Sequence, residues 1–122
     1  MQYSNSYKGL SVWQKSMELV AEVYKLTEKF PKSEIYGLTS QMQRAAVAIP
    51  SNIAEGQKRN HPKEFLQFLY VSYGSGAELE TQIEICKRIY NNKNWDYNTA
   101  ENLLNEVMKM LNVMISSFKQ KL

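Results

Sequence analysis

Five polar residues near the middle of the chain are the first candidates for chemistry, namely Arg44, Asn52, Glu55, Glu78 and Gln82. Arg44 and Glu55 are eleven residues apart, about 16 Å along a helix, so they share a face without pairing. Glu78 or Glu80 could meet Arg44 from another helix. We interpret the five as a structural polar network, buried or at an interface, because a satisfied network specifies one arrangement whereas an unpaired buried charge is costly. A surface ion pair and an active site are the alternatives.

Neither a metal site nor a nucleophile is indicated. Ferritin-like bundles use glutamates and a Glu-x-x-His motif, but no glutamate stands three residues before the single histidine, His61. The single cysteine, Cys86, continues an apolar stripe, which predicts a small core residue. The Gly74–Gly76 stretch falls within a helical pattern and not after a strand, so it is no phosphate loop. We therefore expect no enzyme activity, metal, cofactor or small-molecule substrate.

A basic cluster is the second candidate site. Residues 41–63 hold four cations against one carboxylate, in a chain whose net charge is +3. The residues proposed to contact nucleic acid are Lys58, Arg59, His61 and Lys63, which cluster at one end of the bundle, and Lys87 and Arg88, which lie toward the other end of the third helix. For one chain, a solvated turn is the simpler interpretation. Repeated around a symmetric ring, the cluster predicts a positive band that binds phosphate backbone without reading sequence.

Tyrosine is abundant, with eight residues in the chain. Tyr36, Tyr70 or Tyr73 could provide surfaces on which nucleic-acid bases stack. Tyrosine is also enriched at protein interfaces, and that is the other use open to these side chains.

The composition is that of one globular domain. The chain has 122 residues, of which 43% are apolar and 22% charged, and we expect a single domain over residues 1–122. One cysteine excludes an internal disulfide and suits a reducing compartment. No signal-peptide core and no run of about 18 apolar residues occurs. We expect a cytoplasmic protein that does not enter a membrane.

Four apolar stripes with steps of three and four residues predict four helices, over residues 10–29, 39–57, 62–90 and 97–119. The links between them are short, so each helix must run antiparallel to its neighbours in sequence. The fold predicted is all-α, an antiparallel up-down-up-down four-helix bundle.

The second stripe continues through a proline, Pro50. The apolar spacing is the same from Met42 to Ile53, whereas a proline that ended the helix would reset it. We therefore predict one helix kinked at Pro50. Asn52 could satisfy the region of the Ala46 carbonyl, which loses its usual donor, or contact a neighbouring chain.

Glycines mark the remaining irregularities of the central helices. Gly56 is expected to end the second helix. Gly74 and Gly76 each cost about 1 kcal/mol of helix propensity relative to alanine. We expect close packing at Ser72 and Gly76, against the kink or the small residues 45–46 of the second helix, to compensate.

Three stretches of the chain resemble successive blocks of a bacterial protein family: LSVWQKSMELVAEVYKLTEKFP, YGLTSQMQRAAVAIPSNIAEG and FLQFLYVSYGSGAELETQIEI. The family is the four helix bundle protein family, also called the 23S rRNA intervening-sequence protein family. Residues 43–56 carry its specific pattern, with Arg-Ala-Ala, Ile-Pro and Asn-Ile-Ala-Glu-Gly in one helix. Ala48 and Gly76 depart from the pattern, because serine and a larger residue are expected there.

The resemblance implies a four-helix bundle without enzyme activity or cofactor. Through the related accessory variability proteins of diversity-generating retroelements, it also implies a ring-shaped homopentamer whose basic surface handles nucleic acid. The leading hypothesis is thus a homo-oligomer, a pentamer, that binds RNA or DNA through repeated basic residues. The alternative is an oligomeric scaffold whose partner is another protein.

Overall fold

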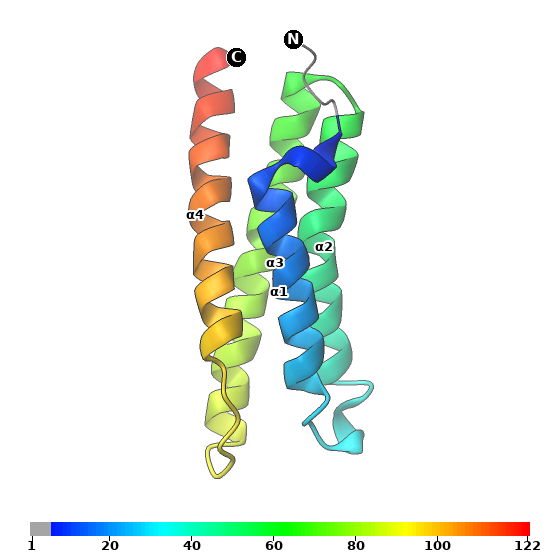
Figure 1. The fold of residues 1–122 in the computed structure, drawn as a ribbon, viewed down its shortest axis with the longest axis vertical. Coiled ribbons are helices and arrows are strands. Elements are labelled where there is room, and N and C mark those ends of the chain that lie inside the picture. Colours follow the sequence, from blue (N-terminus) through cyan, green and yellow to red (C-terminus); the bar gives the residue numbers. More distant parts are fainter. Residues whose placement is uncertain (1–5) are drawn as a thin grey trace.

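The computed structural model describes residues 6–122, which form four long helices, two short 3-10 turns and no strand (Figure 1). Their bounds are η1 (Tyr7–Gly9), α1 (Ser11–Thr27), η2 (Lys32–Glu34), α2 (Leu38–Lys58), α3 (Pro62–Ile89) and α4 (Asn98–Lys121). Successive helices run up and down, α4 packs back on α1, and each helix contacts its two neighbours around a square. The predicted all-α four-helix bundle is confirmed. No helix in the described part of the chain combines the length and apolarity that crossing a membrane requires.

The core is built from apolar side chains of all four helices. Those with no exposed surface include Leu19, Val23, Met42, Ile49, Ile53, Leu69, Leu79, Val107 and Leu111. Cys86 lies among them, fully buried, with its Sγ 3.5 Å from the sulfur of Met42. Burial raises the pKa of its thiol to about 11, with a smaller contribution from Glu34. The prediction that Cys86 is a small core residue is confirmed.

The helix ends lie within two residues of the predicted ranges, with one informative difference at Gly56. The glycine does not end α2, which continues to Lys58, and Asn60, with φ 57°, makes the turn into α3. A Cβ at Gly56 would lie 2.7 Å from Cβ of Phe68 and 2.9 Å from Cδ1 of Phe65. α2 and α3 therefore pack too closely at Gly56 to leave room for a Cβ, and the predicted role of this glycine as a helix stop is wrong.

Pro50 lies inside α2 and is buried, as the unbroken apolar spacing predicts. The Asn52 side chain donates to the Ala48 carbonyl at 2.8 Å, rather than to that of Ala46. The second helix is thus continuous through its proline. The bend that a proline introduces there stays a prediction.

Small residues of α3 face two different neighbours. Ser72 packs against α2, as predicted, and its hydroxyl donates to the Ile49 carbonyl at 2.9 Å. Gly76 instead faces α4, where the Met108 thioether fills the space that a Cβ would need. Gly74 faces open space. The expectation that Gly76 packs against α2 is therefore wrong, because the partner it lies against is a large side chain of α4.

An aromatic cluster closes the end of the bundle that holds the α1–α2 and α3–α4 links, here called the lower end (Figure 1). The ring of Trp95 lies 4.9 Å from that of Phe30 and 5.1 Å from that of Tyr90. The Tyr90 hydroxyl donates to the Glu34 carboxylate, whose other oxygen accepts from the Leu38 amide at 3.1 Å. One carboxylate thus ties the start of α2 to the end of α3.

Candidate nucleic-acid interface

Exposed cations gather at the opposite end of the bundle, the upper end (Figure 1). Lys58 is the last residue of α2, His61 precedes α3, and Lys63 lies in the first turn of α3. The α2–α3 link has only three residues, so these side chains stay close to one another. With Arg59, which lies in the same link, the structure brings together four of the six predicted contact residues.

Two further cations join them from α4. Lys119 and Lys121 lie in its last turn, and the ring of Phe118 lies 5.0 Å from that of Phe65 at the start of α3. The C-terminal end of α4 therefore lies beside the start of α3, at the upper end (Figure 1). We call the following residues the basic end: Lys58, His61, Lys63, Lys119 and Lys121. In residues 6–122 no carboxylate pairs with its four lysines, although the Lys121 ammonium lies 5.6 Å from the centre of the Phe118 ring.

Arg59 lies in the same link but its charge is compensated. Its guanidinium binds Glu55 at 3.1 Å and Glu64 at 3.2 Å, and it lies 5.2 Å from the centre of the Phe68 ring. The hydrogen bond to Glu55 is the main cause that raises the pKa of Arg59. Arg59 therefore joins the end of α2 to the start of α3 and offers less charge to an outside phosphate than the neighbouring lysines.

Lys87 and Arg88 are not part of this cluster. They lie at the lower end, with Lys87 about 36 Å along α3 from Lys63. The Lys87 ammonium binds Glu101 at 2.6 Å and Glu84 at 3.5 Å, and the bond to Glu101 is the main cause that raises its pKa. The structure therefore divides the six predicted contact residues between two ends of the molecule.

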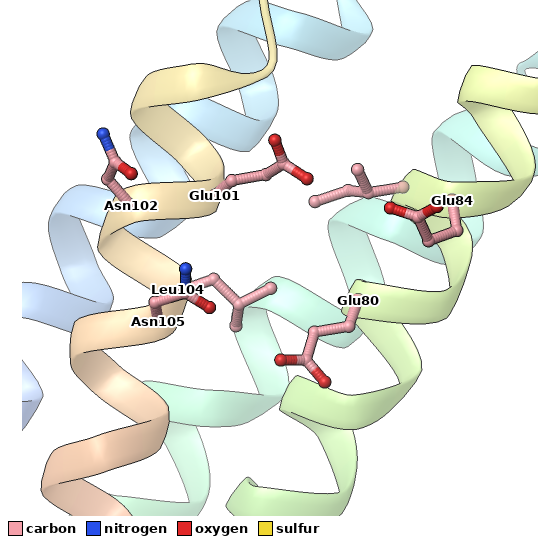
Figure 2. Close-up of a pocket in the computed structure, with 7 residues that line it drawn as sticks. Glu80, Glu84, Glu101, Asn102, Leu104 and Asn105 are labelled. Carbon is pink, nitrogen blue, oxygen red and sulfur yellow. The ribbon is translucent and has the colours of Figure 1, made fainter.

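The groove between α3 and α4 is acidic. Figure 2 shows Glu80 and Glu84 of α3 facing Glu101 and Asn105 of α4 across a hollow of about 340 Å³. Lys87 compensates part of this charge. In the described part of the chain, no three carboxylate, imidazole or thiol groups are placed to hold a metal ion. The negative charge of this groove is unfavourable for phosphate.

The five central polar residues are not joined to one another within residues 6–122. Arg44 donates to Ser40 at 3.3 Å, Glu55 binds Arg59, and Glu78 is exposed on α3. Arg44 and Glu78 line one hollow without forming an ion pair. A network formed between subunits stays a prediction.

Gln82 is the buried member of that set, and its environment gives a stability prediction. It is 5% exposed, and its Oε1 has no donor in the described chain. An unsatisfied buried acceptor is costly, so Gln82→Met should raise the free energy of unfolding by about 1 kcal/mol. Urea denaturation measures this. The exposed Gln67→Met control should change the value by less than about 0.5 kcal/mol. A destabilised Gln82→Met protein would contradict the expectation.

The fold and the surface define an all-α four-helix-bundle protein with one basic end. The chain belongs to the 23S rRNA-intervening sequence protein family, whose profile matches residues 8–113. The same fold occurs in a crystal structure of a protein of unknown function from the S23 ribosomal protein family of Bacteroides thetaiotaomicron. That chain superposes with a TM-score of 0.73 and 22% identity, over 85% of this chain and 97% of its own. Comparison with curated proteins finds no match. The family resemblance is confirmed.

Proposed function

We propose that this protein is a non-enzymatic, self-associating bundle that binds RNA or DNA through its basic end. The observation that carries the proposal is the gathering of Lys58, Lys63, Lys119 and Lys121 at one end of the described chain without carboxylate partners. Exposed lysine side chains at such an end are suited to phosphate oxygens, and contacts to phosphate carry no sequence information. The contact is therefore with the backbone.

Self-association is proposed through the groove between α1 and α2, with a second copy of the chain as its occupant. An apolar hollow of about 350 Å³ lies there, lined by side chains that include Trp13, Met17 and Val47. Met17 is 44% exposed and Val47 39%. The hollow lies on the side of the bundle, so copies packed there with parallel axes present their basic ends together. A cyclic pentamer, as the resemblance implies, would multiply the positive charge fivefold.

Removal of two basic-end lysines tests the proposal. Lys58→Ala/Lys63→Ala should weaken binding of labelled single-stranded RNA and DNA about tenfold, because the variant neutralises fewer phosphates and so releases fewer counterions. The slope of log affinity against log salt, measured by fluorescence anisotropy between about 50 and 200 mM, should become shallower by about 1.4. The matched control Arg88→Ala/Lys93→Ala removes the same charge from the lower end and should keep wild-type affinity.

Two results would contradict this function. Equal reductions of affinity in the two double variants would show that net charge, not the basic end, governs binding. A protein that binds no strand at low salt, while light scattering shows an intact oligomer, would support a scaffold for another protein instead. A monomer at micromolar concentration would remove the self-association part of the proposal.

A further inference from the structure

A hollow of about 600 Å³ lies between α2 and α3, across α3 from the acidic groove. Arg44, Ala45 and Ala48 of α2 line it, together with Glu78 of α3 and Tyr36 from the link before α2. Its volume lies in the range of small-molecule sites. The two alanines give its floor a small, apolar surface, while its charged groups come from opposite walls.

The charged and aromatic groups around this hollow have few interactions with the rest of the described chain. In residues 6–122 neither Arg44 nor Glu78 belongs to an ion pair, and the contact of the guanidinium is a 3.3 Å hydrogen bond to Ser40. The side chain of Tyr36 is 97% exposed, and its ring stacks on no other described ring. Arg59 and Lys87, in contrast, each bind two carboxylates. The hollow therefore offers a cation, a carboxylate and an aromatic face to a ligand.

We propose that this hollow binds a guanine nucleotide unit, with the base against Tyr36, its N–H groups on Glu78 and its phosphate on Arg44. An ionised carboxylate only accepts hydrogen bonds. Guanine presents two adjacent N–H donors on its Watson–Crick edge, whereas adenine, cytosine and uracil each present a donor beside an acceptor. Arginine binds phosphate with two parallel hydrogen bonds, and an aromatic ring stacks on any base. The carboxylate thus supplies the selectivity.

Two sources carry this ligand chemistry: a free guanine nucleotide and an unpaired guanine in a strand. Arg44 lies about 21 Å along α2 from Lys58, so a strand of a few nucleotides held at the basic end is long enough to reach the hollow. The strand version rests on the proposed function, and the free-nucleotide version does not. In the strand version, the hollow adds base selectivity to backbone binding.

Calorimetric titration with the four nucleoside monophosphates tests the site. The wild-type protein should bind GMP about tenfold more tightly than AMP, CMP or UMP, as expected for one good bidentate contact to a base. Glu78→Gln should reduce that preference to less than about twofold, because the amide presents a donor to one of the guanine donors. The matched control Glu80→Gln removes a carboxylate from the other side of α3 and should keep the preference. Tyr36→Ala should weaken the binding of all four nucleotides about tenfold, and Tyr36→Phe should keep the wild-type affinities.

Anisotropy titrations with an oligouridine strand, and with the same strand carrying one guanine, separate the two sources. Tighter binding of the guanine strand, abolished in Glu78→Gln, supports the strand version. Selective GMP binding without a guanine effect in strands supports the free nucleotide as ligand. Lys58→Ala/Lys63→Ala should weaken the binding of both strands and leave GMP binding unchanged. Failure of the backbone-binding proposal can therefore be distinguished from failure of the guanine site. Equal affinities for the four nucleotides, or a preference that survives Glu78→Gln, would overturn the inference.

Discussion

Gly56→Ala should lower the free energy of unfolding by about 2 kcal/mol. The added Cβ would lie 2.7 Å from Cβ of Phe68, an atom next to the α3 backbone, so α2 and α3 must separate to admit it. Overpacking of this kind costs up to about 3 kcal/mol, and the better helix propensity of alanine offsets about 1 kcal/mol. Urea denaturation at fixed protein concentration, followed by circular dichroism, measures the change.

Gly74→Ala is the matched control for that experiment. The same atoms are added on α3, where a Cβ would meet nothing within 4 Å. Only the propensity gain remains, so the variant should be more stable than wild type by up to about 1 kcal/mol. If Gly56→Ala were as stable as Gly74→Ala, the close approach of α2 and α3 at this glycine would not be a packing constraint.

Trp95→Ala should lower the free energy of unfolding by about 3 kcal/mol, the largest decrease expected from one side chain at the lower end. The indole packs against both Phe30 and Tyr90, with ring separations of 4.9 and 5.1 Å, and so joins the α1–α2 link to the end of α3. Truncation of a large aromatic side chain removes apolar burial and leaves a cavity. The same denaturation measurement applies.

Two further variants separate the contributions at that end. Trp95→Phe keeps an aromatic ring, so its free energy of unfolding should fall by less than about 1.5 kcal/mol. Tyr90→Phe removes only the hydroxyl that donates to Glu34, and so measures that hydrogen bond apart from the ring packing. A Trp95→Ala protein as stable as wild type would show that the aromatic cluster does not hold the lower end.

The helices were predictable because each one carries its own apolar period. That signal is local, and burial against a neighbour follows from it whatever the neighbour is. The continuity of α2 through Pro50 was predictable for the same reason, since the apolar phase is unchanged on both sides. Antiparallel order followed from the short links.

The roles of Gly56 and Gly76 were not predictable from one helix at a time. Gly56 is required because Cβ of Phe68 lies opposite it, whereas the space beside Gly76 is filled by the flexible Met108 side chain. Those pairings depend on the axial register between helices, which the apolar period of a single helix does not contain. A glycine in a helical stripe therefore indicated close packing without identifying the partner.

The candidate site was predictable where its residues are neighbours in sequence. Lys58 and Lys63 flank a three-residue link, so their proximity is local. Compensation of Arg59 by Glu55 also had a signal, since the two are four residues apart on one helix. Lys119 and Lys121 were missed, although the up-down-up-down order places the end of the fourth helix beside that link. The pairing of Lys87 with Glu101 depends on packing between helices and had no local signal.

The buried thiol of Cys86 makes the chain suited to chemical labelling. It is the single cysteine, has no exposed surface, and its pKa of about 11 leaves little thiolate at neutral pH. Alkylation of the native protein must therefore await an opening of the bundle centre, and its rate measures the frequency of that opening. A second cysteine introduced at exposed Ser117 would react first, so a fluorophore can be attached there while the natural thiol stays unmodified.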